Sequence, residues 1–454
     1  MRKRVIEESV LFISILKWLF LASCIGAIVG FSTAIFLKLL EYGIGYSKGF
    51  GLYFLLLPVA FFLSSFIIKY LAPEAEGHGT EKVIEAVHKR SGKINPLVVP
   101  IKLFTTIITI ASGGSAGKEG PCAQIGGGLS SVFADLLKFD NKDRKKLVIC
   151  GISAGFASVF GTPIAGAIFG VEVLFVGGLL YDVLFPSFVA GIVGYQVASA
   201  LGIEYFHQPL AFVPVFSSFF FLKVCLGGLF FGFCSFLFIE ILKYHEYLSN
   251  RMNIWKPLKG VVGGVVLVLL TLVVSDKYLG LGLDTITSAL EGGEIFVLAF
   301  LFKMVFTSIT LSFGGSGGIV TPIFFIGATA GNMFGRVFGL DLALFSAIGM
   351  VSLLAGAANT PISASIMAVE IFGPEVAPYA AVACIISFLM TGHRSVYPSQ
   401  VLAIAKSSSI YIPKGKVMDD LDEVEVRLRA RSITGGMVNM TKFVTKFIKK
   451  LMKK

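Results

Sequence analysis

The feature that most constrains this chain is a glycine-rich phrase that interrupts apolar sequence twice. One copy runs from Gly113 to Pro121 (GGSAGKEGP) and the other from Gly314 to Pro322 (GGSGGIVTP). An unpaired backbone N–H or C=O is costly in lipid, so a helix is broken at membrane depth only where protein or a watery cavity satisfies the exposed groups. Two breaks in matching positions of two halves predict a binding site between sequence repeats.

Composition supports a membrane setting for these breaks. The chain has 454 residues, of which 55% are hydrophobic and only 15% charged, and its mean hydropathy is +0.83. Long apolar runs at 10–40, 52–68 and 261–274 support membrane-spanning helices, because roughly 20 apolar residues cross a bilayer core. We therefore expect an integral, multi-pass membrane protein.

The formal charge of +11 does not predict nucleic-acid binding here. The basic residues gather at 2–4, 138–146 and 427–454, which flank apolar segments. Such positions follow the positive-inside rule and attract anionic lipid headgroups, so membrane lipid is the expected partner.

Cysteine and histidine positions give no sign of a metal, a disulfide or another cofactor. The six cysteines lie in apolar sequence without a CxxC pair. The five histidines are scattered and lack the spacing of metal ligands.

Many apolar segments are too short to cross a bilayer upright, which predicts tilted and half-length helices. The short segments are 97–111, 148–160, 163–176, 322–333, 361–372 and 377–390.

A second repeated stretch extends the internal similarity. Residues 150–172 and 348–370 share a Gly-Thr-Pro or Asn-Thr-Pro break followed by a helix that ends in glutamate, Glu172 or Glu370. Both glutamates are expected to serve structure, by capping or pairing at helix ends.

We place the two transmembrane repeats at 1–205 and 206–408 and a basic cytoplasmic tail at 409–454. The repeats are inverted if the first crosses the membrane an odd number of times, a count that the short helices leave open.

Each glycine phrase precedes a helical pattern, at 122–138 and at 323–338. The first backbone N–H groups of a helix are unpaired and the helix dipole is positive there, so such ends attract anions. A third candidate is Gly77-His78-Gly79, before an amphipathic helix at 80–89. A single glycine phrase is best explained by helix packing, but three phrases with agreement between repeats favour a binding role. No acidic pair is available to coordinate a cation, so an anion fits better.

These residues resemble motifs of the CLC family of chloride channels and chloride/proton antiporters. Residues 117–121 (GKEGP) are similar to its GREGP signature, 318–322 (GIVTP) to its GIFAP-type motif, and 72–79 to the segment that ends in GSGIP. Val396-Tyr397-Pro398 is similar to the segment that presents an anion-binding tyrosine. The resemblance covers about residues 10–408.

The resemblance implies an all-α homodimer in which each subunit has two inverted repeats of short, tilted and broken helices and one anion pathway. Glu119 would be the gating glutamate, and the N–H groups of Ile319 and Val320 with the Tyr397 hydroxyl would bind the central anion. An intramembrane carboxylate is expensive and therefore functional by default. The candidate anion-binding residues are Gly77, His78, Gly79, Lys118, Glu119, Gly120, Ile319, Val320, Thr321 and Tyr397.

Two positions depart from the family pattern. His78 stands where the family has a coordinating serine; its imidazole could donate to the anion and respond to pH, or it could turn to solvent. Val173 stands where proton-coupled members carry an inner glutamate, and valine carries no proton. A fluoride-exporting branch with valine there is still understood to exchange protons, so this position does not decide the mechanism.

The resulting prediction is chloride transport gated by Glu119, with passive conduction slightly favoured over anion/proton antiport of chloride or fluoride. A cation-coupled transporter of a small organic anion is a remoter alternative, which Tyr397 and the ordered motifs disfavour. No set of nucleophile, base and orienting group supports an enzyme. The 46 residues after 408 are too few for the paired CBS domains of many relatives, so we expect the prokaryotic type, in the plasma membrane.

Overall fold

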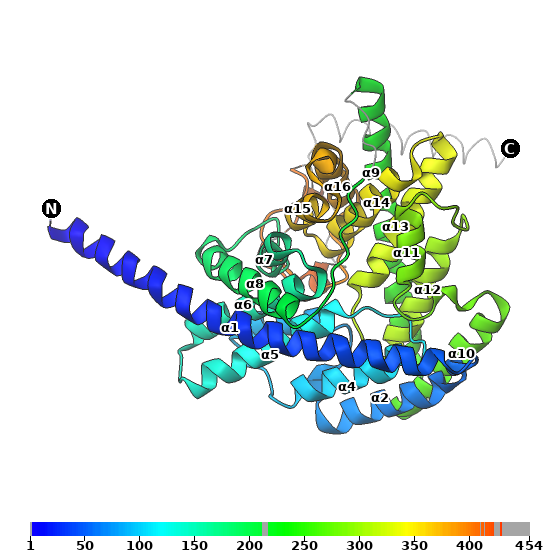
Figure 1. Cartoon of the computed structure of the whole chain (residues 1–454), viewed down its shortest axis with the longest axis horizontal. Coiled ribbons are helices and arrows are strands. Elements are labelled where there is room, and N and C mark those ends of the chain that lie inside the picture. The colour runs from blue at the N-terminus through cyan, green and yellow to red at the C-terminus, as the bar shows by residue number, and fades with distance from the viewer. Residues whose placement is uncertain (1, 211–216, 409, 413, 422–426, 429–454) are drawn as a thin grey trace.

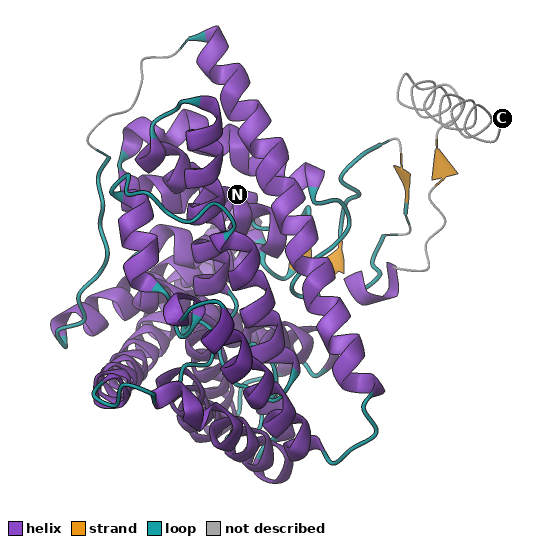
Figure 2. Cartoon of the chain, turned by 90° about the vertical axis from the view of Figure 1, so that its right-hand side faces the viewer, coloured by secondary structure: helices purple, strands orange, loops and turns teal. Residues whose placement is uncertain are grey.

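The computed structural model describes residues 2–210, 217–408, 410–412, 414–421 and 427–428. Within them the fold is almost entirely helical, and the short strands lie at one side (Figure 2). The α-helices are α1 (Arg2–Lys48), α2 (Leu57–Leu71), α3 (Thr80–Lys89), α4 (Val98–Ala111), α5 (Glu119–Leu136), α6 (Asn141–Phe160), α7 (Pro163–Glu172), α8 (Tyr181–Ala200), α9 (Ser218–Arg251), α10 (Lys256–Val273), α11 (Leu283–Leu290), α12 (Ala299–Ser312), α13 (Val320–Phe338), α14 (Leu342–Ala358), α15 (Pro361–Phe372) and α16 (Ala377–Met390). The 3₁₀ helices are η1 (Tyr53–Leu56), η2 (Pro73–Ala75), η3 (Asp276–Tyr278), η4 (Pro374–Val376) and η5 (Met418–Leu421), and the strands are β1 (Phe175–Val176), β2 (Val401–Leu402), β3 (Ile410–Tyr411) and β4 (Arg427–Leu428).

Helix α1 contains the first long apolar run and extends well beyond it. Its 47 residues correspond to about 70 Å at the rise of an α-helix. Figure 1 shows it lying across the body, with its N-terminal part projecting away. Gly26 and Gly30 pack so closely on Ala190 and Gly194 of α8 that a Cβ atom at either glycine would overlap the α8 backbone. This contact fixes α1 against α8 within the first repeat.

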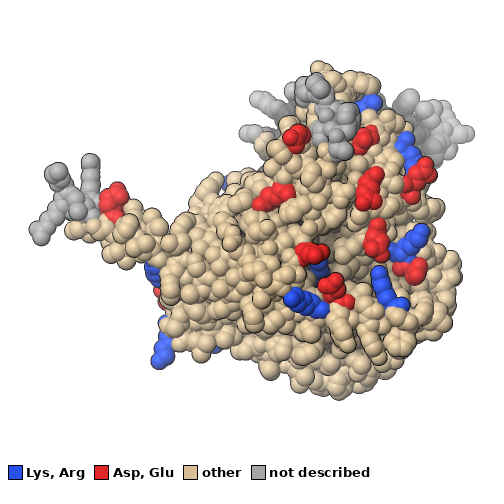
Figure 3. Space-filling model, in the orientation of Figure 1, with Lys and Arg blue, Asp and Glu red and all other residues tan. Residues whose placement is uncertain are grey.

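Five helical segments are long and apolar enough to span a membrane in the part of the chain that the structure describes. They are Ile6–Lys48, Tyr53–Leu71, Tyr181–Ala200, Ser218–Arg251 and Lys256–Val273. The shorter apolar helices α4, α7, α15 and α16 agree with the short segments predicted from sequence. On the face seen in Figure 3, charged side chains gather in the middle and right, and the lower edge is uncharged, as expected of a surface in contact with lipid.

Two of the predicted short segments were wrong in length. Residues 148–160 are the apolar part of the 20-residue α6, and 322–333 belong to the 19-residue α13. Helix α6 begins earlier because the Asp140 side chain accepts a hydrogen bond from the Asp143 N–H (2.8 Å), so a polar first turn precedes the apolar stretch. Helix α13 includes Pro322 in its first turn, where proline is tolerated.

The two glycine phrases meet each other at the centre of the molecule. Gly117 and Gly318 form an antiparallel bridge with N–H to carbonyl distances of 2.7 and 2.6 Å. Matched hydrogen bonds lie beside it, both 3.0 Å long: from Ser115 N to the Thr310 hydroxyl and from Ser316 N to the Thr109 hydroxyl. Equivalent residues of the two repeats thus exchange equivalent contacts, as a two-fold relation between inverted halves requires.

Glu172 and Glu370 cap helices, which confirms the prediction made for them from the sequence. Each carboxylate reaches across the repeat boundary to the first N–H groups of its partner repeat's helix, where the helix dipole favours negative charge. The hydrogen bonds join Glu172 to Ile362 N (3.0 Å) and Ser363 N (2.8 Å) of α15, and Glu370 to Ile164 N (2.9 Å) and Ala165 N (2.8 Å) of α7.

The positive-inside rule predicts which end of the molecule faces the cytoplasm. Lys17 of α1 pairs with Asp143 beside the basic segment 138–146, which the positive-inside rule places in the cytoplasm. Gly92, just after α3, packs on the backbone of Arg144 and Lys145, so α3 lies on this inner side as well. At the opposite end of α1, Lys48 lies 3.8 Å from Asp284, on the side that the same rule predicts to face outward.

Candidate functional site

Three loops and one extended segment converge where the two repeats meet. Helix α3 begins after Gly77-His78-Gly79, α5 begins at Glu119, α13 begins at Val320, and residues 395–400 pack beside them. Gly79 has a φ of +87°, a conformation that favours glycine. A Cβ atom at Gly120 would overlap the His78 carbonyl oxygen, so the start of α5 touches the α3 loop directly.

Glu119 is buried at this junction, with only 1% of its surface exposed. Its carboxylate accepts a hydrogen bond from the Thr321 N–H (3.1 Å) and another from the Thr321 hydroxyl. Both donors belong to the first turn of α13, where the helix dipole favours negative charge. The Glu119 carboxylate therefore occupies donors that a bound anion would need.

Ile319 and Val320 lie beside this carboxylate, as the N-cap and first residue of α13. Helix geometry leaves the N–H groups of the first turn without intrahelical acceptors. The structure thus brings Ile319 and Val320 to the site. The hydrogen bonds to the Glu119 carboxylate, however, come from their neighbour Thr321. Anion binding by Ile319 and Val320 stays a prediction.

Tyr397 and His78 face each other in the same place. Tyr397 is fully buried, and its ring centroid lies 5.5 Å from that of His78. In the described part of the chain neither the Tyr397 hydroxyl nor the His78 Nδ1 atom has a hydrogen-bond partner. Buried polar atoms are seldom left unpaired, so both atoms are available to a ligand or to water. His78 is partly exposed and its Nδ1 atom is buried, so both predicted alternatives for its role stay predictions.

The segment that carries Tyr397 is held by amides and hydroxyls that sequence reasoning missed. The Ser395 hydroxyl accepts the Tyr397 N–H (2.9 Å) and bonds to the Gln400 side chain (2.6 Å). The Gln400 amide donates to the Val173 and Ala358 carbonyls, both at 2.8 Å. Val173 is fully buried, so its contribution is a backbone acceptor that anchors this segment. A buried glutamine has no motif that would mark it in advance.

Lys102 is a further residue that the sequence analysis overlooked. Its fully buried ammonium donates to the carbonyls of Ala75 (3.2 Å) and Gly77 (2.5 Å), which fixes the loop that presents His78. Lys303 holds the matching outer loop of the second repeat through the Tyr278 and Gly280 carbonyls. A lysine at equivalent positions of two apolar helices was the signal that could have revealed them.

Lys118 lies on the outer side of Glu119 and is partly exposed. It lines a cavity of about 980 Å³ together with Lys48, Glu41, Glu204 and residues of the η3–α11 region. Lys118 is the residue of the 113–119 loop that lines it. Lys118 makes no hydrogen bond with the Glu119 carboxylate in the described structure, and its part in anion binding stays a prediction.

Broken helices whose N-termini meet around a buried carboxylate and an unpaired tyrosine define a membrane protein that transports anions. Residues 60–392 match the family described as "Voltage gated chloride channel", and the chain belongs to this CLC family. CLC-type anion transport by an integral membrane protein is thus confirmed as its function.

Two relatives show how far the similarity extends. A "Chloride/fluoride channel protein" of Pseudomonas syringae pv. tomato is 36% identical over 86% of this chain and 88% of that protein. An uncharacterised protein of Methanocaldococcus jannaschii is 29% identical over 85% of this chain and 96% of its own length.

Solved structures agree on the fold. A CLC-type fluoride/proton antiporter superimposes with a TM-score of 0.81 at 27% identity, over 85% of this chain and 98% of that one. A slow cyanobacterial Cl⁻/H⁺ antiporter gives a TM-score of 0.73 at 21% identity, over 82% of this chain and 94% of that one. At this lower identity the second likeness shows the fold alone.

Proposed function

We propose that this protein exchanges a small halide anion for protons, and that Glu119 carries the proton. The observation that supports this is the position of the Glu119 carboxylate, on the Thr321 N–H and hydroxyl at the start of α13. An anion that binds at this helix end must take these donors from the carboxylate. Anion binding is then tied to the removal or the neutralisation of Glu119.

The strength of this coupling follows from electrostatics. Two unit negative charges about 4 Å apart repel by about 4 kcal/mol at an effective dielectric constant of 20. That repulsion corresponds to nearly three orders of magnitude in an equilibrium constant. An ionised Glu119 and a bound halide therefore exclude each other from the same donors, whereas a protonated Glu119 can share them.

The relatives bear on the choice between antiport and passive conduction. The structure with the TM-score of 0.81 is a fluoride/proton antiporter, which favours antiport. The Pseudomonas syringae relative carries the word channel in its name, and Val173 supplies no inner carboxylate, so passive conduction is the second candidate.

The same comparisons bear on the transported ion. Both the 36% and the 27% identical proteins have fluoride in their names, and the former has chloride as well. A compact hydroxyl and N–H pair such as that of Thr321 suits a small, hard anion that demands short hydrogen bonds. Fluoride is the first ion to test, and chloride is the second.

Homodimerisation in the plasma membrane of a prokaryotic cell is the arrangement we propose for the whole protein. Helix α15 packs on both α7 and α16, and apolar side chains of these three helices are exposed in the single chain: Ile164 of α7, Ile362 of α15, and Ile385 and Leu389 of α16. The relatives reported above come from a bacterium and an archaeon. Cross-linking between cysteines introduced at Ile385 in purified protein would show the dimer, and a monomer at all protein concentrations would contradict it.

The function is tested with purified protein in liposomes loaded with fluoride or with chloride. An anion electrode and a pH electrode record both fluxes while valinomycin and potassium set the membrane potential. Antiport predicts that protons move against their gradient when the anion runs down its own. Anion flux without proton movement would establish the passive alternative, and the absence of both halide fluxes would refute the proposal.

A further inference from the structure

Proton exchange needs a group that receives protons on the inner side, and Val173 is not such a group. An inner proton acceptor would then have to be a carboxylate in another position on the inner side of the site. Glu81, the second residue of α3, meets the requirements best. The argument rests on the proposed antiport, because a passive channel would need no inner proton acceptor.

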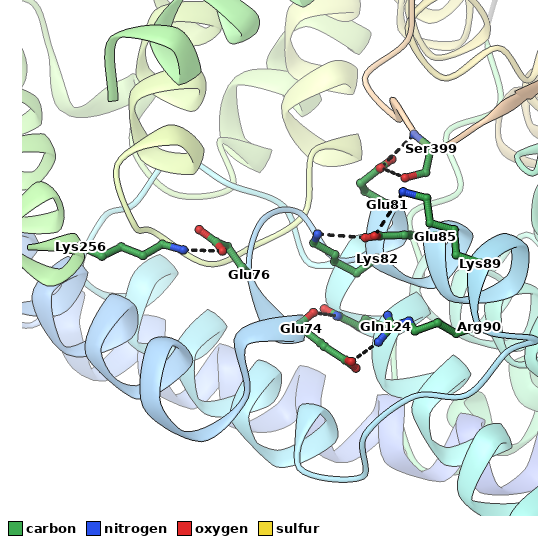
Figure 4. A network of polar contacts seen from close by, with 10 residues as sticks. All are labelled: Glu74, Glu76, Glu81, Lys82, Glu85, Lys89, Arg90, Gln124, Lys256 and Ser399. Atoms are coloured by element: carbon green, nitrogen blue, oxygen red, sulfur yellow. Dashed lines mark hydrogen bonds and ion pairs between the residues drawn. The ribbon is translucent and has the colours of Figure 1, made fainter. Parts of the chain in front are cut away.

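The Glu81 carboxylate lies on the inner side, beside the segment that carries Tyr397. Its Oε1 atom accepts hydrogen bonds from the Ser399 N–H (2.9 Å) and from the Ser399 hydroxyl (Figure 4). Its Oε2 atom is buried and has no partner among the described residues. The residue as a whole is half-buried, so it stands between the inner solution and the interior.

Glu81 differs from Glu74, Glu76 and Glu85 in having no basic partner among the described residues. Figure 4 shows Glu74 bonded to Arg90, Glu76 to Lys256, and Glu85 to Lys82 and Lys89. Those carboxylates belong to ion pairs. In the described part of the chain no lysine or arginine pairs with Glu81 in this way.

Burial, hydrogen bonds and nearby charges all act on the ionisation of Glu81. Burial raises the pKa of Glu81 to about 7, and the two hydrogen bonds from Ser399 oppose this rise. Lys82 lowers it and Glu85 raises it, both from α3 itself. Helices α5 and α6 pack on α3 but present no charged group that acts on Glu81 in the described structure. A group that titrates near neutral pH can both accept and release a proton in the cell.

The route from Glu81 to Glu119 is marked by unpaired polar atoms. Both carboxyl groups lie within electrostatic reach of the Tyr397 hydroxyl. The Glu81 Oε2, the His78 Nδ1 and the Tyr397 hydroxyl are all buried without a partner in the described chain. Buried polar atoms of this kind are usually satisfied by water, and a few waters would join them into one chain of hydrogen bonds.

We propose that Glu81 is the inner proton acceptor of this protein. A proton from the inner solution binds the Glu81 carboxylate, passes along water beside Tyr397 and His78, and protonates the Glu119 carboxylate. Glu81 is left ionised and takes the next proton from the inner side. Glu119 then leaves its Thr321 donors to the anion, which moves in the opposite direction.

The test compares Glu81→Gln with Glu85→Gln in the liposome assay that records both ions. Glutamine keeps an oxygen acceptor for Ser399 but cannot relay a proton. We expect Glu81→Gln to retain anion flux and to lose proton flux by roughly 100-fold, since a positioned acid or base contributes about 10² to 10⁴ to a proton-transfer rate. Glu85→Gln, on the same helix, should keep the proton-to-anion ratio of the unmodified protein.

A second variant separates a proton-carrying role from a structural one. Ser399→Ala removes one donor to the ionised Glu81, so the pH at which proton flux is half-maximal should shift upward by about one unit. A structural contact alone would not move this midpoint. An unchanged proton-to-anion ratio in Glu81→Gln, or equal loss of both fluxes with an unshifted midpoint in Ser399→Ala, would overturn the inference. Absence of proton movement in the unmodified protein would instead refute the antiport itself.

Discussion

Replacing Glu119 by glutamine should make the site bind halide more tightly. The carboxylate competes with the anion through two hydrogen bonds, from the Thr321 N–H and hydroxyl. A hydrogen bond to a charged group contributes about 1.5–3 kcal/mol and one to a neutral group about 0.5–1.5 kcal/mol. The competitor therefore weakens by about 1 kcal/mol per bond, or about 2 kcal/mol in all, which corresponds to roughly 30-fold tighter anion binding.

Isothermal titration of the detergent-solubilised protein with fluoride or chloride measures this affinity. Glu375→Gln, at an exposed position of η4, is the control and should bind as the unmodified protein does. Anion flux through Glu119→Gln should also lose its dependence on pH, because the competing group no longer titrates. Unchanged or weaker halide binding would refute the competition that this mechanism requires.

Three further substitutions test the architecture of the site. Tyr397→Phe keeps the ring but removes the unpaired hydroxyl, so calorimetry should show roughly 10- to 100-fold weaker halide binding; equal affinity would remove this hydroxyl from the site. Lys102→Met leaves two buried carbonyls unpaired and should destabilise the protein by about 2–4 kcal/mol, seen as a lower melting temperature in detergent, whereas the exposed Lys89→Met should not. Gly120→Ala forces a Cβ atom into the His78 carbonyl and should abolish flux in folded protein; normal flux would mean that α5 can move away from this loop.

Local sequence patterns were sufficient where a structure depends on neighbouring residues. The amphipathic helix expected at 80–89 runs over Thr80–Lys89, and the apolar segments 361–372 and 377–390 are helices with those same bounds. The repeated glycine phrases correctly predicted that helix N-termini meet between two halves. Each of these inferences needs only periodicity, glycine, and proline.

Local sequence patterns could not predict contacts between residues that lie far apart in the chain. Glu81 lies 318 residues before Ser399, its hydrogen-bond partner, so nothing in the α3 sequence sets it apart from Glu85. Lys102 looks like one basic residue in an apolar helix until the Ala75 and Gly77 carbonyls are seen around its ammonium. The direction of the Glu119 side chain depends on Thr321, which lies in the other repeat.

Coupling of the anion to the proton is the central claim, and the voltage of zero net flux measures it most directly. Liposomes that contain the protein are given a fixed halide gradient and a series of pH gradients, and the membrane potential that stops anion movement is determined for each. Antiport through Glu119 predicts that this potential shifts with the pH gradient, by an amount that the proton-to-anion ratio sets. A potential set by the halide gradient alone, at every pH gradient, would contradict the account and leave passive conduction as the function.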